Sequence, residues 1–360
     1  MRAFTIACCL AFACPAAATG QQLRSSAVAM DASAAIDETV DANGHYATGV
    51  IVDALVSLEI GRGFRGIVRP FAQRLASTGE WNRQIWVATV RYEHQGSTAI
   101  RVDAGYIAPP IGLANLTLRP HLNPTIAQPS SLFQPLPSLQ VRGPRTNLLG
   151  AIYPLGAVAT VSSLRWDVRG GMIDTSPLRA RRVFAQVNPP QFANLIVGGG
   201  ITPVLGLRLG ASLTRGGWVK AGETPAVTTD RSATVVTVES EFSFRYTKVA
   251  GEWVRDAVDT NGGTRVASGW YVQAQQTLTP RWFLASRLER MSSPRVVALP
   301  GATAVAGIDR LHFSGVEETL GYHLTPDITL RAAHRARRGF GRAGFDHTVA
   351  VSAVFARRWI

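Results

Sequence analysis

The sequence predicts an all-β protein, a closed antiparallel transmembrane β-barrel of about sixteen strands with one long inserted loop. Two observations predict this fold class. Apolar side chains recur at every second position in segments along most of the chain, which is the period of a strand with one apolar face. Short links between these segments alternate with longer ones, which is the asymmetry of a membrane barrel.

The end of the chain, residues 345–360, carries the clearest strand pattern. Val349, Val351 and Phe355 fall on one face, and Thr348 and Ser352 fall on the other. A strand with one face in hydrocarbon needs backbone partners along both edges, because lipid offers no hydrogen bonds. We therefore expect a closed sheet in which the first strand pairs with this last one.

The composition excludes two other classes of protein. Of the 360 residues, 46% are hydrophobic and 8% aromatic, and the mean hydropathy is +0.09. These values exclude a disordered chain and a bundle of membrane helices. After residue 20, no apolar run reaches the ~18 positions that a spanning helix needs.

The start of the chain is typical of a secretory signal. Arg2 precedes an apolar run over residues 3–13, and small residues follow. We expect residues 1–20 to be removed and residues 21–360 to form a single barrel domain.

All three cysteines, Cys8, Cys9 and Cys14, fall inside this signal. The mature chain is therefore expected to contain no disulfide and no cysteine metal site. Cys14 is alternatively a lipoprotein acylation site, although the aliphatic residue usual three positions earlier is absent.

The formal net charge of +13 rests almost wholly on arginine, since Lys220 and Lys248 are the only lysines. A soluble protein this basic would suggest a nucleic-acid partner. Here the arginines are scattered singly and form neither a run nor a helical stripe. We therefore expect no nucleic-acid partner.

Alternation and turn residues predict the first strands in order. The elements are strands at 28–36 and 46–58 joined by a turn at 41–44, a hairpin turn at 61–63, a third strand that Phe64 opens, and strands at 86–92 and 100–106 joined by a turn at 95–97.

Three later links share the sequence Leu/Ile-Thr-Pro, in which proline fixes φ for a reverse turn. They begin at Ile201, Leu278 and Leu324. Other short links are expected at 162–163 and 245–248, and longer ones at 176–191, 220–230, 259–264, 292–308 and 339–344. An even number of strands returns both termini to the end that carries the short turns.

Aromatic residues lie within a few positions of most short turns. Amphipathic rings favour the headgroup level of a membrane, so we expect an interface girdle there. Its predicted members are Phe64, Tyr92, Trp166, Tyr246, Trp282, Tyr322 and Trp359.

Residues 108–145 interrupt the strand pattern. This segment contains eight prolines and no Asp or Glu, and Arg119, Arg142 and Arg145 are among its few charged side chains. A structureless link of this length is uncommon in a compact domain unless it is functional. We expect it to fold into the lumen of the barrel as a constriction loop.

The face opposite each apolar face is predicted to line the lumen. Arginines outnumber acids there, and the acids come mainly from later strands, so one wall is expected to be mostly basic. This excess predicts a preference for anions, although any single arginine can instead pair with acids and water to fill a polar interior. The predicted pore-lining or constriction residues are Arg69, Arg83, Arg91, Arg101, Arg119, Arg142, Arg145, Arg165, Arg169, Arg208, Glu239, Glu241, Arg287 and Arg331. The same face presents Arg65, Arg335, Glu252, Glu289 and Glu317.

Together these features resemble the Gram-negative porins over the whole mature length. Residues 102–112 (Val-Asp-Ala-Gly-Tyr-Ile-Ala-Pro-Pro-Ile-Gly) are also similar to the strand-then-Pro-Gly segment that leads to the constriction of phosphate-selective-type porins. The resemblance implies an outer-membrane channel for passive diffusion of small hydrophilic solutes, anionic or neutral. It implies outer-membrane lipids and the barrel-assembly machinery as partners, and no cofactor or metal.

The resemblance also implies a homotrimer and an inserted loop that narrows the pore. It places Arg119, Arg142 and Arg145 opposite wall arginines. The insert contains no acids, which departs from the acidic loop of general porins.

Two alternatives remain open. His312 and Ser314 share one face of a strand, similar to a pair in outer-membrane phospholipases, but a hydrolase needs a polar side chain to orient the histidine. No asparagine follows Asn261, and no aspartate stands at an obvious cross-strand position. If the insert plugs the lumen fully, the barrel is structural or adhesive.

Glu318 falls on the apolar face, which a bulge or a subunit contact would explain.

Overall fold

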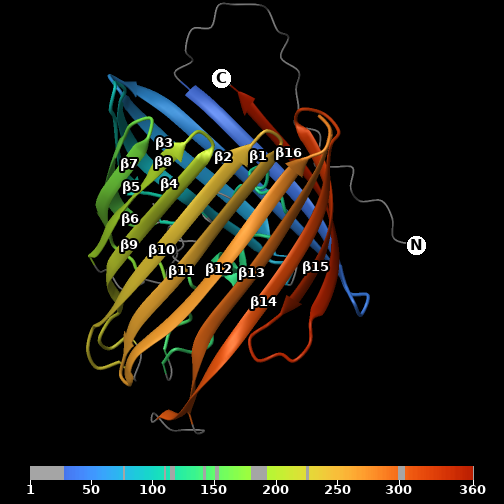
Figure 1. Cartoon of the computed structure of the whole chain (residues 1–360). Coiled ribbons are helices and arrows are strands. Elements are labelled where there is room, and N and C mark those ends of the chain that lie inside the picture. Colours follow the sequence, from blue (N-terminus) through green and yellow to red (C-terminus); the bar gives the residue numbers. More distant parts are fainter. Residues whose placement is uncertain are drawn as a thin grey trace, which may run out of the picture.

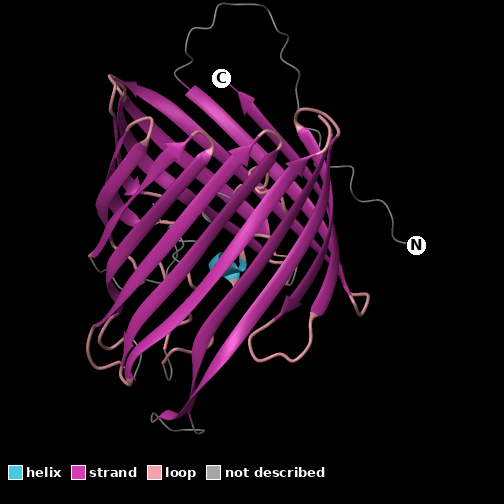
Figure 2. Cartoon of the chain, viewed as in Figure 1, coloured by secondary structure: helices cyan, strands magenta, loops and turns pink. Residues whose placement is uncertain are grey.

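The computed structural model is a closed barrel of antiparallel strands (Figures 1 and 2). It describes residues 28–75, 78–108, 111–113, 118–140, 143–150, 154–179, 193–223, 227–298 and 305–359. The expected signal, residues 1–20, lies outside the described residues. Within the described ranges, no helix is long and apolar enough to cross a membrane.

The described residues form sixteen strands, as the sequence predicts. Each strand pairs with its neighbours along the chain, and β1 closes the barrel against β16, from Met30 opposite Trp359 to Asp41 opposite Thr348. This closure satisfies both edges of the sheet. The strands are β1 (Val28–Asp41), β2 (Tyr46–Gly61), β3 (Phe64–Arg74), β4 (Trp81–His94), β5 (Ala99–Tyr106), β6 (Leu155–Ser162), β7 (Trp166–Ile173), β8 (Asn194–Val204), β9 (Leu207–Val219), β10 (Arg231–Phe244), β11 (Thr247–Thr260), β12 (Gly263–Thr277), β13 (Trp282–Ala298), β14 (Val305–His323), β15 (Ile328–Arg338) and β16 (Asp346–Trp359).

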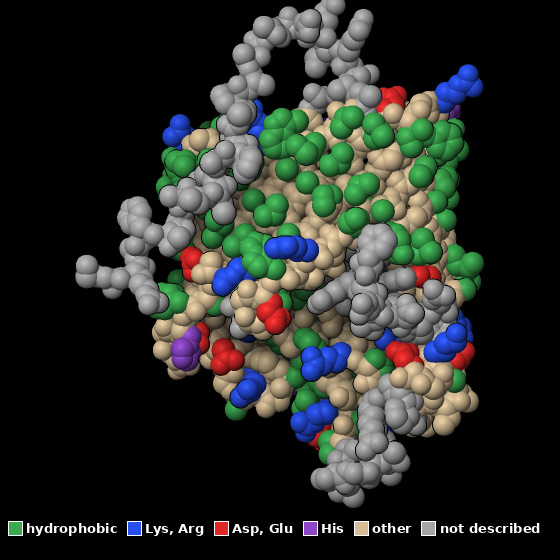
Figure 3. Space-filling model, turned by 180° about the vertical axis from the view of Figure 1, so that it is seen from behind, with side chains coloured by type: hydrophobic (Ala, Val, Ile, Leu, Met, Phe, Trp, Pro, Cys, Tyr) green, Lys and Arg blue, Asp and Glu red, His purple; other side chains and the backbone are tan. Residues whose placement is uncertain are grey.

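The two faces of the wall differ as the alternation predicts. On β16, Val349 and Val351 are 56% and 51% exposed and point outward, whereas Ala350 and Ser352 are buried on the inward side. On the face of the outer wall seen in Figure 3, apolar side chains gather toward the end that carries the C-terminus, and most charged ones lie toward the other end. An apolar outside and a polar inside are the arrangement of a membrane barrel.

Short turns join the strands at the end that carries the C-terminus, here called the turn end, and mostly longer loops join them at the opposite loop end (Figure 1). Two predicted links are wrong in length. Asn261 and Gly262 form a two-residue turn, because an Asn-Gly pair suits a tight hairpin. β13 and β14 continue through most of 292–308, with Pro294 accommodated opposite Arg310.

A bulge between β3 and β4 reverses the alternation along β4. Arg69 pairs with Val87 and Pro70 pairs with Ile85, so Trp86 is the extra residue. Odd-numbered residues point outward before the bulge and even-numbered ones after it, as the exposed fractions of Trp81 (48%) and Val90 (49%) indicate. Arg83 therefore lies on the outward face, and its predicted place in the lumen is wrong.

The described parts of the connection between β5 and β6, residues 107–108, 111–113, 118–140, 143–150 and 154, fold into the barrel (Figure 2). Its short helix α1 (Ser130–Phe133) lies inside the wall. Leu132 and Leu148 of this connection are fully buried and belong to one apolar cluster with wall residues such as Phe313. The insert therefore fills part of the lumen with a packed core.

Replacing Val351 by arginine tests whether the outward face meets hydrocarbon. A cation on the lipid face near the membrane midplane costs about 2–4 kcal/mol. We expect Val351→Arg to lower the free energy of unfolding in lipid vesicles by that amount, measured by urea titration of tryptophan fluorescence. Asn43→Arg in the β1–β2 loop is the control and should change it by less than about 0.5 kcal/mol. Equal effects in both variants would contradict the lipid-facing assignment.

Candidate constriction site in the lumen

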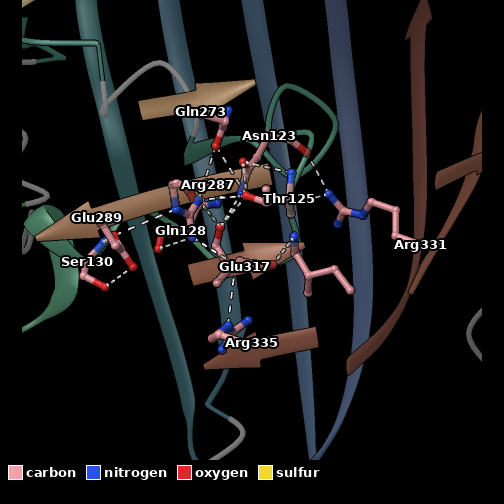
Figure 4. A network of polar contacts seen from close by, with 12 residues as sticks. Asn123, Thr125, Gln128, Ser130, Gln273, Arg287, Glu289, Glu317, Arg331 and Arg335 are labelled. Atoms are coloured by element: carbon pink, nitrogen blue, oxygen red, sulfur yellow. Dashed lines mark hydrogen bonds and ion pairs between the residues drawn. The ribbon is translucent and has the colours of Figure 1, made fainter. Parts of the chain in front are cut away.

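The insert depends on the wall for much of its backbone hydrogen bonding. Residues 108–145 contain eight prolines, and α1 is the regular structure that the described part of the segment forms. Buried N–H and C=O groups must find partners. Inward side chains of β13 to β15 provide them (Figure 4).

Two wall carboxylates accept hydrogen bonds from backbone N–H groups of the insert. Oε1 of Glu317, on β14, accepts from the backbone N of Ile126 at 2.8 Å and of Ala127 at 2.9 Å. Glu289, on β13, accepts from the backbone N of Ser130 at 2.8 Å and from its Oγ at 2.7 Å. Hydrogen bonds to an ionised carboxylate are among the stronger ones in proteins, so these contacts fix the position of the insert.

Two wall arginines donate to backbone carbonyl groups of the insert. Arg287, on β13, donates to Ala127 O at 2.8 Å. Arg331, on β15, donates to Asn123 O at 2.7 Å and to Thr125 O at 2.8 Å. Their exposed fractions are 1% and 5%. Both guanidinium groups therefore bind the insert and do not face open solvent.

Ion pairs link Glu317 and Glu289 to arginines of the same network. Glu317 Oε2 lies 3.0 Å from Arg287 Nη2 and 3.5 Å from Arg335 Nε. Glu289 lies 3.8 Å from Arg287 Nε. Removing one partner of a buried pair leaves an uncompensated charge, so the buried Arg287 and Glu317 depend on each other.

The start of the insert approaches β11 closely. The backbone N of Leu113 donates to Glu252 Oε2 at 3.2 Å. Gly112 has a φ of +71°, and a Cβ at this position would overlap the Glu252 carboxylate. Glycine is therefore required where the insert crosses the lumen.

Arg119 ties the insert to the opposite wall. Its Nη1 lies 2.8 Å from Asp31 Oδ2 on β1, and its Nε lies 3.2 Å from Asp53 Oδ2 on β2. Asp53 also accepts two hydrogen bonds from Arg69, at 2.9 and 2.8 Å. The resemblance places Arg119 opposite wall arginines, but the structure pairs it with wall carboxylates, with Arg69 sharing one of them.

A cavity of about 480 Å³ lies between the insert and the wall of β2 to β10. Many of its lining residues lie a few positions from turns, so the cavity is nearer the turn end. Six arginines and four acids line it: Arg69, Arg91, Arg101, Arg119, Arg169, Arg208, Asp103, Asp167, Glu239 and Glu241.

Ion pairs link most of these charges around the cavity. Asp103 lies 2.6 Å from Arg91 Nε and 3.1 Å from Arg101 Nε. Arg208 contacts Glu239 at 2.7 Å and Asp167 at 2.9 Å. The cavity wall is thus a belt of alternating charge with arginine in excess.

The remaining predicted lumen residues lie elsewhere or pair locally. Arg165 is exposed in the turn between β6 and β7, and Arg145 is exposed on the insert. Arg142 lies outside the described residues. Glu241 lines the cavity and lies 3.3 Å from Lys248 Nζ, and Arg169 donates to Ser212 Oγ at 2.7 Å.

The sequence reasoning missed the aspartates that neutralise the early strands. Asp31, Asp53, Asp103 and Asp167 all pair with arginines of the lumen. The alternation of apolar and polar residues along each strand places these four aspartates on the inward face. Extending the acid count to β1, β2, β5 and β7 would have found them.

The aromatic residues predicted as a girdle cluster at the turn end. Phe64 and Tyr92 pack with ring centroids 5.0 Å apart, and Trp282 and Tyr322 pack at 4.6 Å. Trp359 is 39% exposed at the end of β16. Trp166 begins β7, and Tyr246 is 70% exposed in the β10–β11 turn.

The His312 and Ser314 pair lies on the outward face of β14, as the alternation predicts. Ser292 stands opposite His312, and Arg290 and Arg338 stand opposite Ser314. These cross-strand neighbours include no carboxylate or amide that could orient the imidazole. Over the described ranges, no group of three or more His, Cys, Asp or Glu is arranged to hold a metal ion.

Glu318 points outward without a bulge. The β13–β14 register shifts only between Val297 and Ala298. The residues opposite Glu318 are Ser286 and His334, so polar side chains continue across three strands there.

Comparisons with solved structures find the same fold at low sequence identity. No family model and no curated protein matches the chain. The trimer form of OmpT, an outer membrane protein of Vibrio cholerae, has a TM-score of 0.57 at 9% identity and covers 92% of this chain and 99% of its own. Salmonella typhi OmpF in complex with daunomycin has a TM-score of 0.60 at 10% identity, with coverages of 92% and 97%. An anion-selective porin from Comamonas acidovorans has a TM-score of 0.56 at 10% identity, with coverages of 92% and 98%. The chain therefore has a porin-like barrel fold.

Removing the Glu317 carboxylate tests the attachment of the insert. Glu317→Ala leaves two amides without their acceptor and takes the closest carboxylate from the buried Arg287, which we expect to lower the free energy of unfolding by about 3–5 kcal/mol. Limited proteolysis in detergent should then cleave the insert faster. Glu318→Ala, one residue along the same strand on the outward face, is the matched control and should resemble the parent. Equal proteolysis of the two variants would show that Glu317 does not hold the insert.

Proposed function

We propose that the protein is an outer-membrane porin that lets small hydrophilic solutes diffuse passively, with a modest preference for anions. The observation that carries this proposal is the cavity beside the insert, whose lining has six arginines against four acids. In a confined aqueous path, such a wall attracts anions and repels cations. The Comamonas neighbour is itself an anion-selective porin.

The preference should be modest because carboxylates interleave with the arginines. Arg91 and Arg208 each lie within 3 Å of a carboxylate oxygen. Arg101 has a side chain that is 47% exposed and shares Asp103 with Arg91, so its charge is less fully compensated. Arg287 and Arg331 are bound to the insert and contribute little to selectivity.

The proposal includes the orientation and partners of the barrel. The turn end with both termini would face the periplasm and the loop end the exterior. Assembly would follow export through a cleaved signal and the barrel-assembly machinery, and the product would be a homotrimer in outer-membrane lipids. Transport of this kind needs no cofactor and no catalytic residue.

The packed insert favours one second candidate, a plugged structural barrel. Leu132 and Leu148 contact the wall through a buried apolar cluster, and this cluster occupies lumen space that a solute would need. The two functions differ in conductance: a channel gives discrete current steps in a planar bilayer, and a plugged barrel gives none.

Reversing the charge of Arg101 tests the anion preference. Arg101→Glu changes the lining from six arginines and four acids to five of each. One unit charge at 4 Å contributes about 1 kcal/mol in water, so we expect the anion-to-cation permeability ratio to fall roughly two-fold or more. The ratio is obtained from reversal potentials in a KCl gradient.

Arg281→Glu in the β12–β13 turn is the control for charge reversal outside the lumen. It should leave the reversal potential near that of the parent. A parent channel that selects cations, or an Arg101→Glu channel with unchanged selectivity, would refute the proposed anion preference.

A further inference from the structure

The outer wall over β2 to β4 carries a second cavity, separate from the lumen. It measures about 490 Å³, and its lining includes Val52, Ala54, Ala72, Ile85 and Arg83. Val52 is 46% exposed and pairs with Ala72, which pairs with Arg83, so these three share the outward face. We call this cavity the outer groove.

The bulge at Pro70 creates the outer groove. It turns the Trp86 ring inward, where it stacks on the Phe71 ring with centroids 3.6 Å apart; Phe71 and Trp86 are 5% and 6% exposed. The outward positions at this height are then occupied by the small side chains of Ala54 and Ala72. The small side chains leave the shallow, mostly apolar outer groove.

Two arginines stand at the loop end of the outer groove. Arg83 lies over the Trp81 ring, with its Cζ 5.9 Å from the centroid. Arg74 lies opposite Trp81 and donates to Thr48 O at 2.8 Å. Within the described residues, neither arginine has a carboxylate at ion-pair distance. The outward Glu38 of β1 accepts a hydrogen bond from Thr48 Oγ1 at 2.9 Å.

We propose that the outer groove binds a lipid with an anionic, phosphate-bearing headgroup. One acyl chain would lie along Val52, Ala54 and Ala72, and the phosphate would contact Arg83 and Arg74. This inference rests on the proposed membrane location and names one lipid site within it. Guanidinium groups bind phosphate by paired N–H donors, and arginine stems pack on apolar surface while the head reaches the headgroup level.

The uncompensated arginines favour a lipid over a second copy of this chain. A protein partner that covered the groove through apolar contacts would bury Arg83 without an acid, which is costly. A lipid phosphate supplies the missing negative charge at the loop end of the groove.

Native mass spectrometry of the detergent-purified full chain tests the proposal. The probes are phosphatidylglycerol, which is anionic, and phosphatidylcholine, which has no net charge. We expect tighter binding of phosphatidylglycerol to the parent. Arg83→Gln should weaken phosphatidylglycerol binding about five-fold, the equivalent of the ~1 kcal/mol that one arginine contributes at an anionic surface, and weaken phosphatidylcholine less, because the choline cation offsets the charge of its phosphate.

Two further variants separate the contribution of the apolar groove to lipid binding from that of positive charge elsewhere on the barrel. Ala72→Leu fills the groove and should weaken both lipids, whereas Arg281→Gln, in a turn at the other end, should weaken neither. Inorganic phosphate should not displace the lipid.

Three outcomes would overturn the proposal. Arg83→Gln could bind phosphatidylglycerol as tightly as the parent, or inorganic phosphate could displace the lipid fully. In the third, Ala72→Leu dissociates an oligomer of this chain and leaves lipid binding unaffected, which would assign the groove to a second copy. Channel conductance of Arg83→Gln should equal that of the parent, because this side chain lies outside the lumen. If the parent protein gave no conductance, the channel proposal would be refuted, but the lipid-binding result could still be interpreted.

Discussion

The constraint on which the interior depends is the hydrogen bonding of a proline-rich backbone inside a closed wall. The wall strands satisfy most of one another's backbone groups, so they offer few to the insert; one that they offer is the N–H of Val296 on β13, which donates to Ser138 O at 2.9 Å. Inward side chains of the wall supply further partners, and Glu289, Glu317, Arg287 and Arg331 bind backbone groups of the insert directly. The charges of the later strands therefore hold a loop in place.

This use divides the lumen arginines into two sets. Arg287 and Arg331 are buried against the insert, whereas Arg91, Arg101 and Arg208 line the cavity on the other side. The division follows the path of the insert, which leaves β5 and crosses to β11, β13, β14 and β15. The space left over is the cavity between the insert and the wall of β2 to β10, whose lining has more arginines than acids.

The sequence predicts the wall better than the interior, for physical reasons. Alternation in β16 is strong because each outward side chain meets one environment along the whole strand, so Val349 and Val351 could be assigned without the structure. The outward position of Arg83 could not be assigned from the sequence, because one extra residue at Trp86 reverses the alternation along β4 and leaves no clear trace in the composition. The binding of Arg287 to Ala127 joins residues 160 positions apart. Periodicity within a strand carries no information about such contacts.

Amide hydrogen exchange at Ile126, Ala127 and Ser130 tests the central claim most directly, because these N–H groups are the ones bound by Glu317 and Glu289. If wall carboxylates hold the insert, these amides exchange slowly, on the timescale of strand amides such as those of β13 and β14. Exchange as fast as that of the exposed β1–β2 loop, residues 42–45, would contradict the account.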